Sequence, residues 1–217
     1  MYARVGVLPV ILSQLYVIVD AEVLAARGVA LVDFASELRA AGVTLLQYRD
    51  KNGSPQEVLR AASILRDAFS GSDCRLILND RADLAVLANF DGVHVGQGDL
   101  SPEDARRVVG PDRIVGVSTH TDDQVRRADQ SCADYIAIGP VFATGTKSDA
   151  SPVVGLEGVR RARALTTKPL VAIGGITRAN ARSVIDAGAY SVAVISALFA
   201  ANHSPQQVAR DFLARLR

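Results

Sequence analysis

Two stretches near the end of the chain decide the fold: LVAIGGI at residues 170–176 and SVAVIS at residues 191–196. Each contains consecutive apolar residues, several of them β-branched, which is the pattern of a strand that is buried on both faces. Each run then ends at small residues, a pair of glycines in the first and a serine in the second. Strands of this kind are typical of parallel sheets that are covered by helices, so the two stretches predict an α/β protein.

Similar apolar runs recur along the whole chain. They alternate with longer segments whose apolar residues have helical spacing, and Ser-Pro pairs at residues 54–55, 101–102 and 204–205 mark helix starts. The pattern predicts eight strands, at residues 15–19, 44–48, 75–78, 92–95, 113–117, 135–138, 170–173 and 191–195.

Two architectures fit strands that alternate with crossover helices, an open doubly wound sheet and a closed barrel. Eight repeats of about 25 residues favour a single (β/α)8 TIM barrel. No GxGxxG follows the first strand, which argues against a dinucleotide-binding sheet. We expect one domain over residues 1–217, with residues 1–13 as an N-terminal extension that packs on the barrel.

The composition indicates a globular protein. Of 217 residues, 49% are apolar and 22% are charged, and the formal net charge of +1 gives no reason to expect nucleic acid or an acidic membrane as a partner. The apolar run at residues 5–12 is broken by Pro9 and is too short to span a bilayer. We therefore expect a cytoplasmic protein in which Cys74 and Cys132 are buried, reduced thiols, and we leave open whether it forms homo-oligomers.

In a β/α barrel, chemistry gathers at the carboxyl ends of the strands, and polar residues do follow the predicted strands. After the second strand come Gln47, Tyr48, Arg49, Asp50 and Lys51. Alternation along a strand places Gln47, Arg49 and Lys51 on one side and the other two residues on the opposite side. Two cations and an amide suit a diphosphate, whereas the simpler alternative is a solvated charged loop.

Two aspartates, Asp80 and Asp99, end the third and fourth strands. Because these strands are neighbours, both carboxylates could hold one Mg²⁺, which takes one or two carboxylates together with waters and phosphate oxygens. The alternative is that each aspartate caps a helix. After the fifth strand, Ser118 is placed to donate to an anion, whereas His94, inside a strand, is expected to be structural.

Two later loops predict a second anion site. Residues 139–149 form a long loop rich in glycine and hydroxyl groups, in which the backbone at residues 144–146 could cradle a phosphate and Lys147 supplies charge. The glycines at 174–175 and the serine at 196 follow the last two strands, where many barrels bind phosphate through backbone N–H groups. One substrate would then lose diphosphate, and the other would arrive as a monophosphate.

At these residues the chain resembles the thiamine phosphate synthase family over all eight strands. The matching stretches are LYVIVD (15–20), QYRDK (47–51), LILNDRADLA (76–85), GVHVGQGDL (92–100), GVSTH (116–120), DYIAIGPVFATGTKSDA (134–150) and VAIGGI (171–176). The chain departs from the family pattern at Gly145, where many relatives have proline, and at Gly98, where an acidic residue is frequent.

The resemblance implies a Mg²⁺-dependent transferase and a role for each matching residue. It implies that an aminopyrimidine diphosphate is bound by Gln47, Arg49, Lys51, Asn79, Ser118 and Lys147, and Tyr48 and Asp50 belong to the same motif. It implies Mg²⁺ at Asp80 and Asp99. It implies that a thiazole phosphate is bound by Thr144, Gly145, Thr146, Gly175, Ile195 and Ser196. Catalysis would depend on Arg49, Lys51, Ser118 and Lys147.

The implied reaction joins the pyrimidine methylene to the thiazole nitrogen and releases diphosphate, through a dissociative substitution that needs alignment and leaving-group stabilisation. The thiazole phosphate could be the plain or the carboxylated form. Two alternatives remain, a barrel that tautomerises a thiazole phosphate and a non-catalytic phosphate sensor on the same scaffold.

Overall fold

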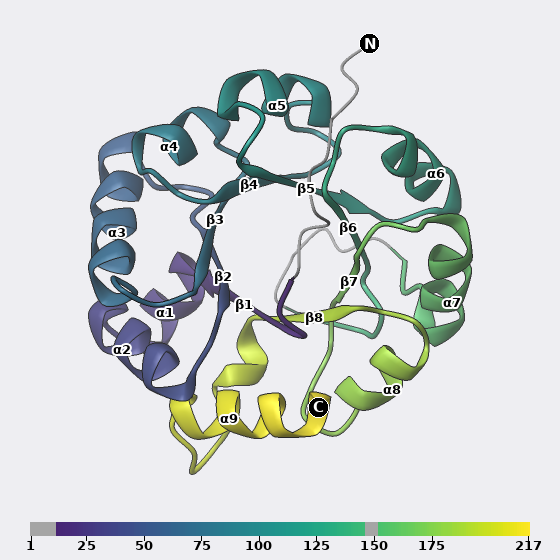
Figure 1. Ribbon diagram of the computed structural model, residues 1–217. Helices are drawn as coiled ribbons and strands as arrows, with labels where there is room; N and C mark the ends of the chain where they lie inside the picture. Colours follow the sequence, from purple (N-terminus) through teal and green to yellow (C-terminus); the bar gives the residue numbers. More distant parts are fainter. Residues whose placement is uncertain (1–11, 146–151) are drawn as a thin grey trace.

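The computed structural model describes residues 12–145 and 152–217, which form a closed barrel of eight parallel strands surrounded by helices (Figure 1). The strands follow one another around the barrel in chain order, and the eighth closes on the first through the pairing of Leu15 with Val192. The predicted (β/α)8 TIM barrel is therefore confirmed, and each predicted strand end lies within two residues of the observed one.

The strands are β1 (Leu15–Asp20), β2 (Leu45–Arg49), β3 (Arg75–Asn79), β4 (Gly92–Val95), β5 (Ile114–Thr119), β6 (Tyr135–Ile138), β7 (Leu170–Ile173) and β8 (Ser191–Val194). The helices are α1 (Ala21–Arg27), α2 (Leu31–Ala41), α3 (Pro55–Ala68), α4 (Ala82–Leu87), α5 (Pro102–Val109), α6 (Asp122–Gln130), α7 (Gly155–Leu165), α8 (Ala181–Asp186), the short 3₁₀ helix η1 (Ser196–Leu198) and α9 (Pro205–Leu216).

The three Ser-Pro pairs begin helices as predicted. The hydroxyl oxygens of Ser54, Ser101 and Ser204 each accept a hydrogen bond from the third residue of the helix that follows. Such a hydroxyl cap stabilises a helix start by about 1 kcal/mol. Each proline stands at the first helical position, where a missing N–H removes no hydrogen bond.

Alternation along the strands divides the apolar side chains between two cores. Residues such as Leu15, Val17 and Leu46 pack between the sheet and the helices. Their neighbours on the same strands, such as Tyr16 and Leu45, point into the barrel and form a smaller interior cluster, which also contains Leu12. The rest of the predicted N-terminal extension, residues 1–11, lies outside the described residues.

One glycine shapes the barrel interior. A Cβ atom on Gly116 of β5 would lie 2.0 Å from a ring carbon of Tyr135, so the absence of a side chain makes room for this ring. The Tyr135 side chain is fully buried and its ring lies edge-on to that of Tyr16, with the ring centroids 6.0 Å apart. The two tyrosines thus bring hydroxyl groups into an interior that is otherwise mainly apolar.

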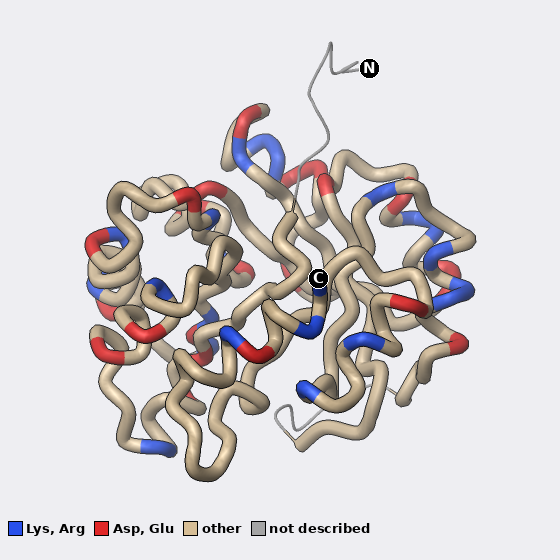
Figure 2. Tube along the Cα trace, turned by 60° about the horizontal axis from the view of Figure 1, so that its bottom comes forward, with Lys and Arg blue, Asp and Glu red and all other residues tan. Residues whose placement is uncertain are grey.

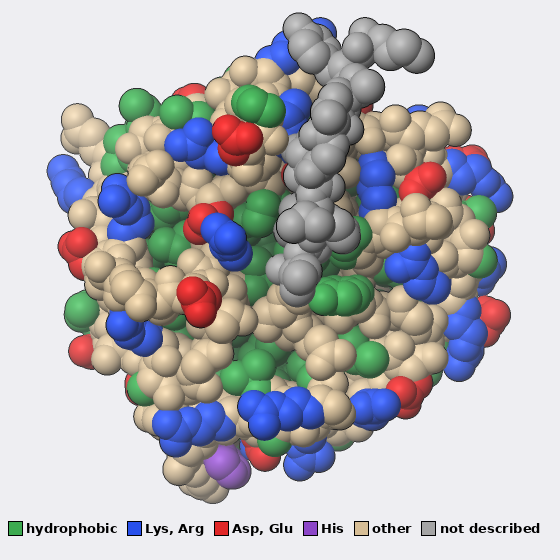
Figure 3. All heavy atoms as spheres, in the orientation of Figure 1, with side chains coloured by type: hydrophobic (Ala, Val, Ile, Leu, Met, Phe, Trp, Pro, Cys, Tyr) green, Lys and Arg blue, Asp and Glu red, His purple; other side chains and the backbone are tan. Residues whose placement is uncertain are grey.

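Charged side chains of both signs are interspersed along the helices (Figure 2) and over the face of the molecule that Figure 3 shows. Many of them pair within one helix, as Arg126 does with Asp123 and Arg182 with Asp186. Exposed pairs of this kind contribute about 0 to 1 kcal/mol each. Among the described helices, none has both the length and the apolar composition needed to cross a bilayer.

The two cysteines are reduced as expected, but only one of them is buried. Both are free thiols, and Cys74 is buried as predicted. Cys132, in the turn between α6 and β6, is only half-buried, so the expectation that both thiols are buried is corrected for this residue.

Candidate active site

A hollow of about 880 Å³ opens at the carboxyl ends of the strands. It brings together most of the residues that the sequence selected for the site. These are Gln47, Arg49, Lys51, Asn79, Asp80, Asp99, Ser118, Thr144, Gly175, Ile195 and Ser196. They come from seven strands or the loops that follow them, so the parallel strand ends bring together residues that are spread over about 150 positions of the sequence.

Five of the selected residues are not among those that line the hollow, for two different reasons. Tyr48 and Asp50 do not line the hollow, as described below, and Gly145 is not among its lining residues either. Thr146 and Lys147 lie outside the described residues. Their predicted roles in substrate binding therefore remain predictions from the sequence.

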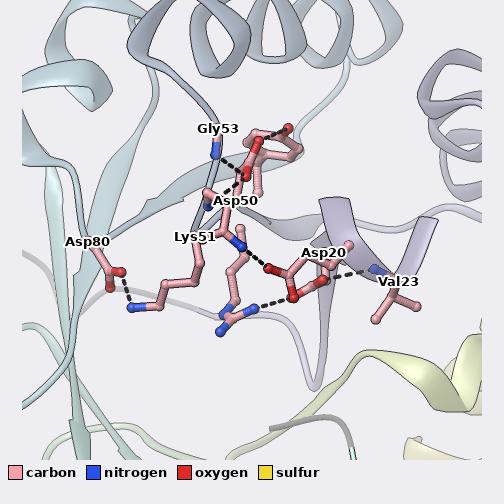
Figure 4. A network of polar contacts seen from close by, with 10 residues as sticks. Asp20, Val23, Asp50, Lys51, Gly53 and Asp80 are labelled. Atoms are coloured by element: carbon pink, nitrogen blue, oxygen red, sulfur yellow. Dashed lines mark hydrogen bonds and ion pairs between the residues drawn. The ribbon is translucent and has the colours of Figure 1, made fainter. Parts of the chain in front are cut away.

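Tyr48 and Asp50 point away from the hollow, as alternation along β2 predicts. The Tyr48 ring is buried in the core between sheet and helices, and its hydroxyl donates to Asp50 Oδ2 over 3.3 Å. Burial raises the pKa of this hydroxyl well above its usual value, and the nearby Asp50 charge adds to the rise. Asp50 Oδ1 in turn accepts from the backbone N–H of Gly53 over 2.7 Å (Figure 4). Tyr48 and Asp50, which belong to the substrate-binding motif in the sequence, therefore lie outside the hollow and hold the turn after β2.

Arg49 points into the hollow and pairs with Asp20 at the end of β1. The carboxylate is 2% exposed and the guanidinium side chain 14% exposed, so the pair is largely shielded from water. The second oxygen of Asp20 accepts from the backbone N–H of Val23 over 3.1 Å and caps helix α1 (Figure 4). Asp20 therefore fixes both the start of this helix and the position of the arginine.

Lys51 reaches across to Asp80, with which it forms an ion pair (Figure 4). Burial raises the pKa of the Asp80 carboxyl, the ammonium of Lys51 lowers it, and the neighbouring Asp99 raises it again. The two aspartates are thus close enough to interact, and neither caps a helix, since Arg81 and Ser101 occupy the positions before α4 and α5. The alternative interpretation of these aspartates as helix caps is excluded.

The backbone at Asp80 is unusual. Its φ of 62° lies in the left-handed region, which non-glycine residues seldom adopt, although aspartate tolerates it better than most. The backbone N–H of Asp80 donates to the carbonyl of His94 over 2.7 Å and holds the residue in this conformation. The turn places the carboxylate at the mouth of the barrel beside that of Asp99, and one or two carboxylates are what Mg²⁺ commonly takes from a protein. Asp80 and Asp99 are the only two neighbouring carboxylates that line the hollow among the described residues, so they are the candidates for holding Mg²⁺.

Asn79, one residue earlier, contributes a donor without a partner. Its Nδ2 atom is buried and has no hydrogen-bond partner among the described residues. An unsatisfied buried donor costs about 1 to 3 kcal/mol, so a ligand oxygen that reaches this amide would recover a hydrogen bond. This fits the prediction that Asn79 binds substrate.

Glycines on the opposite side of the hollow shape the loop after β7. Gly174 and Gly175 have φ values of 103° and 63°, which side chains disfavour. A Cβ atom on Gly175 would also lie 2.5 Å from the carbonyl oxygen of Ala143, in the loop after β6. The glycine pair therefore lets that loop, which carries Thr144, pack closely beside the end of β7, and both Thr144 and Ser196 line the hollow.

Reasoning from the sequence missed several residues of the site. His120 lines the hollow, and its Nδ1 lies 2.6 Å from the carbonyl oxygen of Gly139, which can only accept a hydrogen bond. His94, expected to be structural, lines the hollow as well, as do Tyr16 and Gln97. Alternation on β1 and β4 could have placed Tyr16 and His94 inside the barrel, but no motif distinguishes them from core residues.

The sequence is similar to those of known thiamine-phosphate synthases. The sequence model described as thiamine monophosphate synthase matches residues 15–198. A thiamine-phosphate synthase from Koribacter versatilis is 56% identical over 204 residues, which cover 93% of this chain and 95% of the relative. One from Chloroflexus aurantiacus is 42% identical over 189 residues, which cover 87% of this chain and 86% of the relative.

Solved structures give the same result. A thiamine phosphate pyrophosphorylase from Pyrococcus furiosus superposes with a TM-score of 0.83 at 32% identity, covering 94% of this chain and 95% of that one. A 3-hexulose-6-phosphate synthase superposes with a TM-score of 0.69 at 18% identity, covering 94% and 99% of the two chains, which shows the barrel fold alone.

Proposed function

This chain belongs to the thiamine monophosphate synthase family and is a transferase, and we propose that it joins an aminopyrimidine diphosphate to a thiazole phosphate at the mouth of its barrel. The products would be thiamine phosphate and free diphosphate. The observation that carries this proposal is the meeting of Arg49, Lys51, Asp80 and Asp99 in one hollow. Two cations beside two carboxylates suit a diphosphate that arrives with a divalent cation.

The charge balance of the hollow supports a role for Mg²⁺. Arg49 and Lys51 are already matched by Asp20 and Asp80, so a diphosphate brings negative charge that these pairs do not offset. Asp80 and Asp99 would hold the ion, which when bound offsets charge that develops on the departing diphosphate. Lys147, which the family resemblance places in the same site, would supply one more cation.

The residues of the chain then serve mainly to bind and align. Arg49 and Lys51 would bind diphosphate oxygens, and Asn79 would donate its free N–H to the same substrate. The backbone around Gly175 and Ser196, together with Thr144 from the loop beside Gly175, would hold the phosphate of the thiazole, so that its ring nitrogen faces the pyrimidine methylene. Alignment and stabilisation of the leaving group are enough for a dissociative substitution, which needs no nucleophilic side chain.

The contribution of one cation can be estimated. At an effective dielectric constant near 20, a cation about 4 Å from the leaving group stabilises it by roughly 4 kcal/mol. Loss of Arg49 or Lys147 should therefore lower the rate by about two to three decades, since about 1.4 kcal/mol corresponds to a factor of ten.

The test is incubation of the purified chain with both substrates and Mg²⁺, followed by detection of free diphosphate. We expect Asp80→Ala and Lys147→Ala to lose most activity and to keep the wild-type melting temperature. Asp83→Ala is the matched control, because this aspartate is exposed and pairs with Arg81 at the start of α4. Wild-type turnover in Asp80→Ala or Lys147→Ala would contradict the proposal. Tautomerised thiazole phosphate without diphosphate would indicate a tautomerase, and binding without any product would indicate a sensor.

A further inference from the structure

A line of hydrogen bonds crosses the interior of the barrel along the wall of the hollow. Gln47 Nε2 donates to the hydroxyl of Tyr16 over 2.8 Å, and this hydroxyl lies 2.9 Å from that of Tyr135. His94 continues the line, with Nδ1 2.8 Å from the Tyr135 hydroxyl and Nε2 2.8 Å from Ser118 Oγ. The line joins Gln47 and Ser118, two proposed substrate-binding residues, through three residues to which the proposed reaction assigns no role.

The direction of this line follows from counting protons. An amide nitrogen only donates, so the Tyr16 oxygen accepts from Gln47, and the one proton of Tyr16 has the Tyr135 oxygen as its acceptor. Tyr135 then donates its own proton to His94 Nδ1. The neutral ring therefore carries its hydrogen on Nε2 and donates it to Ser118. In the reversed direction a fully buried hydroxyl proton of Tyr16 would face the amide nitrogen, and such unsatisfied donors are rare.

Burial and packing hold the line in place. Tyr16 is 1% exposed and Tyr135 0% exposed. Gly116 leaves the space that the Tyr135 ring fills, and the His94 ring stacks on it with centroids 5.4 Å apart. Burial also raises the pKa of both tyrosine hydroxyls well above the usual value, so both keep their protons at neutral pH.

Both ends of the line open on the hollow with a defined polarity. Ser118 accepts from His94, so its own hydroxyl proton has no acceptor among the described residues and can be donated to a ligand. At the other end, the side-chain oxygen Oε1 of Gln47 accepts no hydrogen bond from the described residues, while the side-chain nitrogen Nε2 donates to Tyr16. The hollow thus offers a donor at Ser118 and an acceptor at Gln47.

We propose that Tyr16, Tyr135 and His94 are positioning residues that fix Ser118 as a hydrogen-bond donor and Gln47 as an acceptor toward the substrate. This rests on the proposed function for the identity of the substrate, the aminopyrimidine diphosphate. The group that meets Ser118 is then an acceptor, such as a ring nitrogen or a diphosphate oxygen. The group that meets Gln47 is a donor, such as the exocyclic amine.

The first test measures the tautomer of His94, which reports the direction of the hydrogen bonds, and it needs no substrate. The chain has three histidines, so ¹⁵N-histidine labelling gives a spectrum in which His94→Gln and His203→Asn identify the signals. We expect His94 in the ligand-free wild type to be the Nε2–H tautomer, with Nδ1 unprotonated. The Nδ1–H tautomer, or an equal mixture of both, would overturn the proposal because the line would run the other way or have no fixed direction.

The second test uses Tyr135→Phe, which keeps the ring and removes the hydroxyl at the centre of the line. We expect the KM for the pyrimidine diphosphate to rise about tenfold, the effect of one misdirected hydrogen bond, while the KM for the thiazole phosphate changes less than about twofold. Tyr190→Phe is the matched control, because Tyr190 is 40% exposed and precedes β8, at the opposite end of the barrel. An unchanged KM for the pyrimidine diphosphate, or an equal rise for both substrates, would overturn the proposal.

A third variant separates polarity from packing. His94→Gln retains one acceptor and one donor and should keep the KM for the pyrimidine diphosphate within about threefold, whereas His94→Leu should raise it about tenfold or more. Equal KM values in these two variants would contradict the proposal. If Tyr135→Phe does not fold, the tautomer of the wild type still decides the question. If the wild type releases no diphosphate, the proposed function fails, while the tautomer measurement tests the line independently.

Discussion

The ion pair of Asp20 and Arg49 links the stability of the barrel to its site, and replacing the aspartate tests this link. Asp20 has two tasks: one carboxylate oxygen caps α1 through the backbone of Val23, and the other pairs with Arg49. Asp20→Asn keeps an oxygen that can cap the helix and removes the charge. Asp20→Ala removes both the cap and the charge, so the two variants separate the two contributions.

The magnitudes follow from burial. Breaking a buried ion pair by removing one partner costs about 3 to 5 kcal/mol, because the remaining charge is left uncompensated. Arg49 is 14% exposed and can reach some water, so the lower end, about 3 kcal/mol, applies to Asp20→Asn. Loss of the cap adds about 1 kcal/mol in Asp20→Ala. For a chain of this size, these values correspond to melting temperatures lowered by about 9 and 12 °C.

Urea unfolding monitored by circular dichroism at pH 7.5 measures the free energy of unfolding of each variant. The matched control is Asp83→Asn, whose pair with Arg81 has side chains that are 56% and 48% exposed, and which should lose less than about 1 kcal/mol. If Asp20→Asn loses no more free energy than this control, the pair behaves as a surface pair and the reasoning from burial is refuted.

Three further predictions concern other parts of the barrel. Gly175→Ala places a methyl group 2.5 Å from the carbonyl oxygen of Ala143, on a residue whose φ is 63°. We therefore expect the free energy of unfolding in urea titrations to fall by about 2 to 3 kcal/mol, and the KM for the thiazole phosphate to rise. An unchanged unfolding midpoint would contradict this. Burial raises the pKa of Asp80, so this carboxyl takes up its proton at a higher pH than an ordinary aspartate: Mg²⁺ titrations of activity should show weaker binding at pH 5.5 than at pH 7.5. Its protonation favours the folded state, so Asp80→Asn should not lower the melting temperature at pH 7.5, and a clear loss would count against this sign. Burial raises the pKa of the Cys74 thiol to about 12. A thiol reagent at pH 8 should therefore label Cys132 faster than Cys74 in the folded protein, and should label both cysteines at the same rate in urea. Equal labelling rates in the folded protein would refute the difference in burial.

The fold was predictable because it depends on patterns that repeat. Every predicted strand is found, and alternation along β2 correctly separates Gln47, Arg49 and Lys51 from Tyr48 and Asp50. These patterns are local in sequence, since the side-chain period of a strand is two. Counting the repeats was enough to choose a closed barrel over an open sheet.

The site was predictable only where strand ends carry charges or glycines. Asp20 belongs to a quoted stretch, LYVIVD, yet nothing in the sequence shows that it meets Arg49, which lies 29 positions later. His94 and Tyr135 have the local surroundings of core residues, and their contact depends on the closure of the barrel across 41 positions. The cytoplasmic location and the roles of Thr146 and Lys147 stay predictions from the sequence.

The register of β2 explains why a barrel can place a charged site directly above an apolar interior. Leu45 lies in the interior cluster, Gln47 and Arg49 line the hollow, and each step of two residues rises about 6.6 Å. A slip of one residue would turn Arg49 toward the helices and Tyr48 toward the substrate. The hydrogen bond from Tyr48 to Asp50, and the turn that Asp50 holds, oppose such a slip from outside the hollow. The residues of the QYRDK motif that do not line the hollow therefore help to keep in place the ones that do.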